Sequence, residues 1–217
     1  MRWRGDVPGS ASEPGWLTAA ELRRAYASGA LSPREVCGEV LARAERRNPA
    51  LRAFLSLTAE SAMRRAAAAE REWTRRRRRG ETDGAPLLLG VPVSIKDTVD
   101  VAGVPTTMGS LAGAGRPAAQ DELFVERLRA AGGVLVGKTN TPEFGMAPHT
   151  INRLGEACAN PWDTGRTAGG SSGGAAAACA AGRGARDAGG AVWGRCITGP
   201  MAAARSGSRP PSAAASV

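Results

Sequence analysis

Two short apolar runs, separated by a segment with helical periodicity, constrain the fold of this chain more than any other feature. Residues 87–95 and residues 134–136 are rich in Leu, Val and Ile, which is typical of strands buried on both faces of a sheet. The segment 121–131 between them carries apolar residues at helical spacing, and these are Leu123, Phe124 and Leu128. A strand, a helix and a strand in this order predict an α/β fold.

Helix-start signals predict further helices before the first apolar run. Thr18 and Glu21 form a capping box, and the helix that they open is predicted to end at Gly29. Ser32 is a second cap, and a proline follows it at the first helical position. The remaining predicted elements are a short strand over residues 53–57 and a long, alanine-rich helix over residues 58–78.

The net charge of +9 is concentrated in two places. Arg75–Arg79 is a block of five arginines, and residues 183–217 carry five arginines against one acid, Asp187. The block lies at the predicted end of a helix, where cations are favourable. Aromatic residues do not interleave with the basic residues as they do in single-strand binders, so nucleic-acid binding is not expected.

The sequence also argues against several other protein classes. No apolar run approaches the roughly 20 residues that cross a bilayer, and no apolar stretch follows the charged N-terminus, so we expect neither a membrane span nor a secretory signal. The four cysteines form no C-x-x-C pair, and they are Cys37, Cys158, Cys179 and Cys196. We therefore expect reduced thiols, no metal site and a cytoplasmic location.

Gly169–Gly174 has the sequence GGSSGG and is followed at once by four alanines. Four glycines around Ser171 and Ser172 let backbone amides approach a ligand, and a helix that begins directly behind them suits a developing oxyanion. A flexible Gly/Ser linker is one alternative, but a linker would not run straight into a strong helix former. A phosphate-binding loop is another, but the Lys-Ser/Thr ending of a P-loop is missing.

Lys96 ends the first apolar run and is the second candidate for chemistry. Burial lowers the pKa of a lysine amine, and a neutral amine can act as a general base. In the alternative, Lys96 pairs with Asp97 or extends its amine to solvent. The single histidine, His149, suggests no Ser-His-Asp triad, so a hydrolase of this sequence would pair Lys96 with Ser171 or Ser172.

Four motifs resemble the amidase signature family, in the same order. They are Gly90–Asp97 (GVPVSIKD), Gly137–Phe144 (GKTNTPEF), Asn160–Asp163 (NPWD) and the GGSSGG run. The resemblance covers residues 16–182 and implies the N-terminal half of that α/β fold, a mixed sheet covered by helices, which would be incomplete here. It also implies hydrolysis of a carboxylic amide by a Ser–cis-Ser–Lys triad.

The resemblance assigns roles to individual residues. Lys96 is expected to be the general base and Ser171 the bridging serine, joined to Gly170 by a cis peptide bond. The loop that contacts substrate and oxyanion would consist of Gly169, Gly170, Ser172 and Gly173. The family implies a small-molecule amide as substrate, no cofactor or metal, and often a homodimer.

The family's nucleophile is missing from its expected place. Its motif has the form Gly-Thr-Asp-x-Gly-Gly-Ser-x-Arg-x-Pro, whereas this chain has Asp187–Ala191, with Ala191 in place of the serine and Trp193 in place of the arginine. Because alanine has no hydroxyl, this chain is predicted to be inactive. The alternatives are the amide-transferring A subunit of a tRNA-dependent amidotransferase, and a non-catalytic fragment.

Residues 183–217 are rich in Gly, Ala, Arg, Ser and Pro, and they lack apolar periodicity. GC-rich codons can be chosen for residues 199–217 that, when translated from one nucleotide earlier, encode Gly-Thr-Asp-Gly-Gly-Gly-Ser-Ile-Arg-Ile-Pro and a plausible continuation. We therefore interpret this segment as an amidase gene translated out of frame. The predicted organisation is an extension over 1–15, a partial amidase domain over 16–182 and an out-of-frame tail over 183–217.

Overall fold

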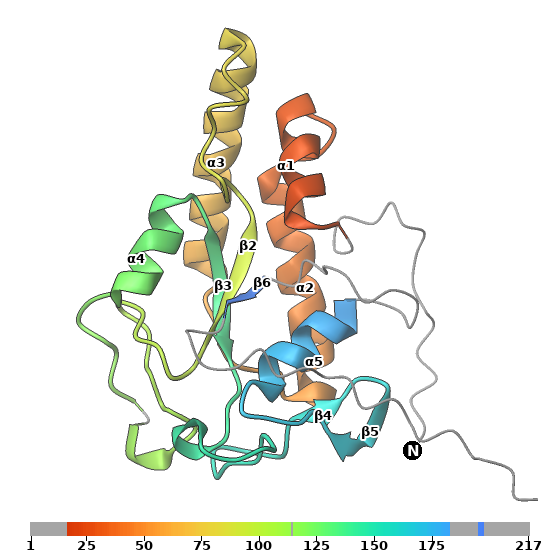
Figure 1. The fold of residues 1–217 in the computed structure, drawn as a ribbon, viewed down its shortest axis with the longest axis vertical. Helices are drawn as coiled ribbons and strands as arrows, with labels where there is room; N and C mark the ends of the chain where they lie inside the picture. Colours follow the sequence, from red (N-terminus) through yellow and green to blue (C-terminus); the bar gives the residue numbers. More distant parts are fainter. Residues whose placement is uncertain (1–16, 114, 183–194, 198–217) are drawn as a thin grey trace, which may run out of the picture.

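A mixed four-stranded sheet forms the centre of the molecule in the computed structural model, which describes residues 17–113, 115–182 and 195–197 (Figure 1). The strand order is β1 (Phe54–Leu57), β3 (Val134–Thr139), β2 (Pro92–Lys96) and β6 (Arg195–Ile197). Strand β2 is parallel to both of its neighbours, and β1 is antiparallel to β3. The predicted α/β class is therefore confirmed.

Helices cover both faces of this sheet. One face packs against α1 (Ala19–Ser28), α2 (Pro33–Leu51), α3 (Ala59–Arg79) and α5 (Gly173–Gly182). The other face packs against α4 (Leu123–Ala130). Figure 1 shows α2 and α4 on opposite sides of the β2–β3 pair.

The alternation of side chains along β3 divides the core into two clusters. Val134 and Val136 pack with the four-helix side, whereas Leu135 between them packs with Ile95 and Leu128 on the α4 side. Successive strand residues point to opposite faces, so a strand that is apolar throughout must be covered on both. This explains why the first three residues of β3, 134–136, are all apolar.

The predicted helix caps are present. Thr18 and Glu21 make both bonds of the capping box at α1, which ends at Gly29 with φ 82°. Ser32 caps α2 in the same way, with proline at the first helical position. Helix α3 ends in the arginine block, and its last turn contains four arginines.

Two predictions for the apolar segments were wrong. Residues 87–90 form a turn rather than the start of a strand, and the side chain of Leu87 is 73% exposed. Leu123 is 61% exposed, and Val125 is buried in its place. Leu123 lies five residues before the buried Leu128, and a spacing of five takes a side chain off the shared face of a helix, whereas a spacing of three keeps it there.

Two features of the fold were not predicted. Strands β4 (Ala159–Asn160) and β5 (Asp163–Thr167) form a small antiparallel hairpin between β3 and α5. Strand β6 lies inside the segment 183–217, for which no strand was predicted because the segment lacks apolar periodicity; its backbone pairs with β2, and backbone pairing needs no particular side chains. Ala191 and most of that segment lie outside the described residues. Within the described part of the chain, no helix is long and apolar enough to cross a membrane.

Candidate active site

Lys96 and Ser171 meet at the carboxyl end of strand β2. Lys96 is the last residue of the strand, and its side chain is nearly buried, with 8% of the residue exposed. Its Nζ donates a hydrogen bond to Ser171 Oγ at 2.8 Å. The predicted contact between the two residues is therefore present, although they lie 75 positions apart in the sequence.

Ser171 lies in a sharp turn directly before helix α5, and the peptide bond between Gly170 and Ser171 is cis. A Cβ atom at Gly170 would approach the backbone nitrogen of His149 to 2.7 Å and the carbonyl oxygen of Ala147 to 2.8 Å. Only glycine fits this close packing of two backbone segments. Ser172, the other candidate partner of Lys96, opens helix α5 instead, and its carbonyl accepts from the Ala176 amide at 3.0 Å.

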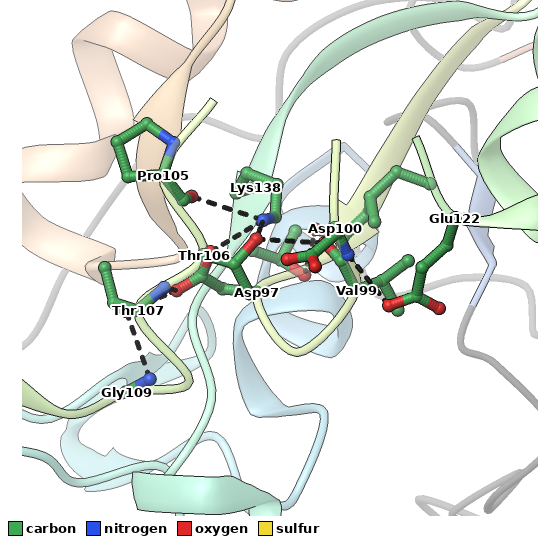
Figure 2. A network of polar contacts seen from close by, with 11 residues as sticks. Asp97, Val99, Asp100, Pro105, Thr106, Thr107, Gly109, Glu122 and Lys138 are labelled. Carbon is green, nitrogen blue, oxygen red and sulfur yellow. Dashed lines mark hydrogen bonds and ion pairs between the residues drawn. The ribbon is translucent and has the colours of Figure 1, made fainter. Parts of the chain in front are cut away.

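The carboxylate of Asp97 is buried in a network of its own, which Figure 2 shows. Lys138 Nζ lies 3.0 Å from Asp97 Oδ1 and also donates to the Pro105 carbonyl at 3.3 Å and to Thr106 Oγ1 at 2.9 Å. Asp97 Oδ2 accepts from the amide of Thr107 at 3.0 Å and from its hydroxyl. Asp97 thus binds Lys138 and Thr107 while its neighbour Lys96 contacts Ser171, which favours the interpretation of Lys96 as a base.

The sequence did not single out this ion pair. Lys138 is completely buried, and Asp97 is 1% exposed. Lys138 stands in an apolar strand just as Lys96 does, so the same reasoning about a buried lysine could have identified it.

Only some of the loop amides are available for an oxyanion. The Gly169 amide already donates to Thr167 Oγ1 at 3.3 Å, and the Gly173 amide donates to Thr150 Oγ1 at 3.1 Å. The Gly174 amide donates to the Asn140 carbonyl at 3.2 Å. Within the described part of the chain, the amides of residues 170–172 donate no hydrogen bond. The oxyanion loop of Gly169, Gly170, Ser172 and Gly173 stays a prediction.

Threonine and asparagine side chains surround the turn that contains Ser171. Thr141 Oγ1 donates to the Ser171 carbonyl at 3.3 Å, and Thr150 Oγ1 donates to the Gly169 carbonyl at 2.7 Å. Asn152 Nδ2 donates to the Thr141 carbonyl at 2.8 Å. The sequence assigned no role to these residues, although Thr141 lies in the GKTNTPEF motif, because single polar residues in a loop follow no periodicity.

Two buried cysteines are poor nucleophiles. Burial raises the pKa of the Cys37 thiol to about 11 and that of the Cys158 thiol to about 12. A protonated, buried thiol is inert. No group of three or more His, Cys, Asp or Glu side chains that could hold a metal ion occurs among the described residues.

Comparison with known proteins gives one consistent result. The family model described as Amidase matches residues 35–191. The chain is 44% identical over 168 residues to the glutamyl-tRNA(Gln) amidotransferase A subunit from Chloroflexus aggregans, covering 77% of this chain and 33% of that protein. It is 42% identical over 169 residues to an acylamidase of Rhodococcus erythropolis, covering 78% and 34%.

Solved structures agree with the sequence relatives. A bacterial aryl acylamidase of the amidase signature family superposes with a TM-score of 0.68 and 34% identity, covering 77% of this chain and 34% of that one. The chain thus spans about a third of the length of the relatives that it matches.

Proposed function

The chain belongs to the amidase signature family, and from that membership we propose that it carries part of an amide-hydrolysing site, with Lys96 as general base and Ser171 as proton relay. The observation that carries the proposal is the 2.8 Å contact between Lys96 Nζ and Ser171 Oγ. The two groups lie within the distance over which a proton passes along a hydrogen bond.

In the proposed reaction, the hydroxyl of a nucleophilic serine attacks the carbonyl carbon of the amide. Its proton moves to Ser171 Oγ while the proton of Ser171 moves to Lys96 Nζ, so the relay ends with a charged lysine and a neutral bridging serine. When the tetrahedral intermediate collapses, the C–N bond breaks and the proton returns along the same path to the departing amine. Water then hydrolyses the acyl ester, and the carboxylate leaves.

This cycle requires Lys96 to be neutral before the attack. A buried environment disfavours the charged amine, and Lys96 is nearly buried. The negative charge of Asp97 would oppose this if it stood alone, but Lys138 compensates it at 3.0 Å. The buried pair therefore supports the proposed role of Lys96 as a base.

The nucleophile is the part of the proposed site that this sequence lacks. Ala191 occupies the position of the serine in the simplest alignment, and alanine cannot attack a carbonyl. We therefore expect no turnover from the chain as it stands. The proposed explanation is that residues 199–217 are translated out of frame, so that the neighbouring frame encodes the Gly-Thr-Asp-Gly-Gly-Gly-Ser motif.

A second candidate function is amide transfer. The similarity to the amidotransferase relative, at 44% identity, is as high as that to the acylamidase, at 42%. An amide-transferring enzyme would release ammonia from glutamine, whereas an amidase of the proposed kind would release the amine of an aryl amide.

The third candidate is a fragment without an activity of its own. The cytoplasmic location stays a prediction.

The test begins with the encoding DNA. The neighbouring frame should contain Asp-Gly-Gly-Gly-Ser and remain open; an early stop there, without this motif, would contradict the frameshift. The chain as it stands and the frame-restored protein are then incubated with an aryl amide and, separately, with glutamine. We expect amine release from the aryl amide by the restored protein alone. Turnover by the present chain that disappears in Lys96→Ala would show that another residue is the nucleophile.

A further inference from the structure

One buried hydroxyl bridges the two ends of the turn that contains Ser171. Thr150 Oγ1 donates a hydrogen bond to the Gly169 carbonyl at 2.7 Å and accepts one from the Gly173 amide at 3.1 Å. The three residues between these contacts are Gly170, Ser171 and Ser172. A single side chain thus fixes both the entry to the turn and its exit.

Thr150 is itself held firmly in place. It is completely buried, and its backbone carbonyl accepts from the Cys158 amide at 2.9 Å. The Cys158 carbonyl accepts in turn from the Ala168 amide at 2.9 Å, directly before the turn begins. Backbone hydrogen bonds therefore connect Thr150, through Cys158, to the residue that directly precedes the turn.

The atoms around the Thr150 hydroxyl are closely packed. A Cβ atom at Gly173 would clash with Thr150 Oγ1 and would lie 2.9 Å from Thr150 Cβ. Thr141 Oγ1 adds a contact to the Ser171 carbonyl at 3.3 Å. Only a few backbone bonds separate Ser171 from either end of the turn. The position of Ser171 Oγ relative to Lys96 Nζ therefore depends on how these ends are fixed.

From this geometry we propose that Thr150 is a positioning residue that holds Ser171 against Lys96. The proposal rests on the roles proposed above for Lys96 and Ser171, but it concerns their placement rather than turnover. Without the hydroxyl, the Gly169 carbonyl and the Gly173 amide lose a buried partner, and the turn should open more often while the rest of the fold remains closed.

The chain offers a precise reporter for such local opening, because it contains only two lysines, Lys96 and Lys138. Lys96 lies beneath the turn with 8% exposed, whereas Lys138 is fully buried in strand β3. Acylation by acetic anhydride, followed for each lysine by peptide mass spectrometry, reports the opening of the turn through Lys96 and global unfolding through Lys138.

The experiment compares variants of the intact chain. Thr150→Val removes the hydroxyl and keeps the shape, Thr150→Ser keeps the hydroxyl, and Gly173→Ala displaces the hydroxyl without deleting it. Thr58→Val is the matched control, because Thr58 Oγ1 donates to the Leu135 carbonyl at 2.8 Å away from the turn. We expect Thr150→Val and Gly173→Ala to raise the acylation rate of Lys96 by about 5- to 30-fold.

Thr150→Ser should stay near the rate of the parent chain. Thr58→Val should raise the acylation of Lys138 through its general effect on stability, and it should raise the acylation of Lys96 by no more than the same factor. Equal responses of Lys96 to Thr58→Val and Thr150→Val, or no response to Thr150→Val, would overturn the proposal.

If Thr150→Val does not fold, the acylation of Lys96 in Gly173→Ala is compared with that in Thr58→Val instead. A larger response in Gly173→Ala supports the proposal, and an equal response overturns it. Acylation needs no turnover, so the proposed function can fail while the labelling pattern holds. The labelling pattern can also fail while the frame-restored protein hydrolyses the aryl amide, so the two failures are distinguishable.

Discussion

Replacing Lys138 with methionine should destabilise the fold strongly, because it leaves the Asp97 carboxylate buried without a cation. Asp97 is 1% exposed and Lys138 is fully buried, with 3.0 Å between the charged atoms. Methionine has a similar length and fills the same space, so the substitution removes the charge and its hydrogen bonds with little change in packing.

The expected magnitude follows from the burial of the pair. Breaking a buried ion pair from one side costs about 3–5 kcal/mol, a large share of the ~5–15 kcal/mol that stabilise a typical domain. Asp97→Asn should cost a similar amount, because it leaves the Lys138 ammonium without its counterion. The double variant Asp97→Asn/Lys138→Met removes both charges, so its cost should fall about 1–3 kcal/mol below the sum of the single costs.

Urea unfolding followed by circular dichroism measures all three free energies. Arg166→Met serves as the control, because the side chains of Arg166 and Asp163 are 79% and 56% exposed in their 3.0 Å pair, and an exposed pair should contribute about 1 kcal/mol or less. Strict additivity of the two single substitutions, or costs no larger than that of Arg166→Met, would refute the reasoning.

Two further predictions concern a helix cap and the buried thiols. Ser32→Ala removes the hydroxyl that accepts from the Arg34 amide at 3.1 Å and the Glu35 amide at 3.4 Å, so the free energy of unfolding should fall by about 1 kcal/mol, as measured by urea unfolding. Burial raises the pKa of Cys37 from 9.0 to about 11, so as the pH rises through this range the unfolded chain loses a proton that the folded chain keeps, and stability should fall. Cys37→Ala should flatten this fall in pH-dependent unfolding, and an unchanged slope would contradict the assignment.

The local elements were predictable because their signals are contained in short segments. The capping residues at Thr18 and Ser32 determine where α1 and α2 begin, and both caps are present. The pairing of Lys96 with one of the two serines was predictable for a different reason. A lysine at the end of a buried strand and two serines in a glycine frame leave few alternatives once a triad with histidine is excluded. The choice of Ser171 over Ser172 came from the resemblance to the amidase signature family.

Contacts between polar residues far apart in the sequence could not be predicted in the same way. Lys138 and Asp97 lie far apart along the chain, and their pairing becomes visible only when β2 and β3 are placed side by side. Thr150 lies in a loop without periodicity, and its role depends on the approach of Gly169 and Gly173. The start of strand β2 could not be predicted either, because an apolar run does not reveal at which residue a strand begins. Leu87 belongs to the run but is exposed.

The proposed function is tested most directly by a double-mutant cycle on the frame-restored protein, with kcat/KM for an aryl amide measured for Lys96→Ala, Ser171→Ala and the double variant. When two residues act in one proton relay, substituting either of them removes the contribution of both to catalysis. Each single variant should therefore lose nearly as much activity as the double variant. Independent, multiplying losses, or near-normal activity in Lys96→Ala, would contradict the assignment of Lys96 and Ser171 to one proton relay.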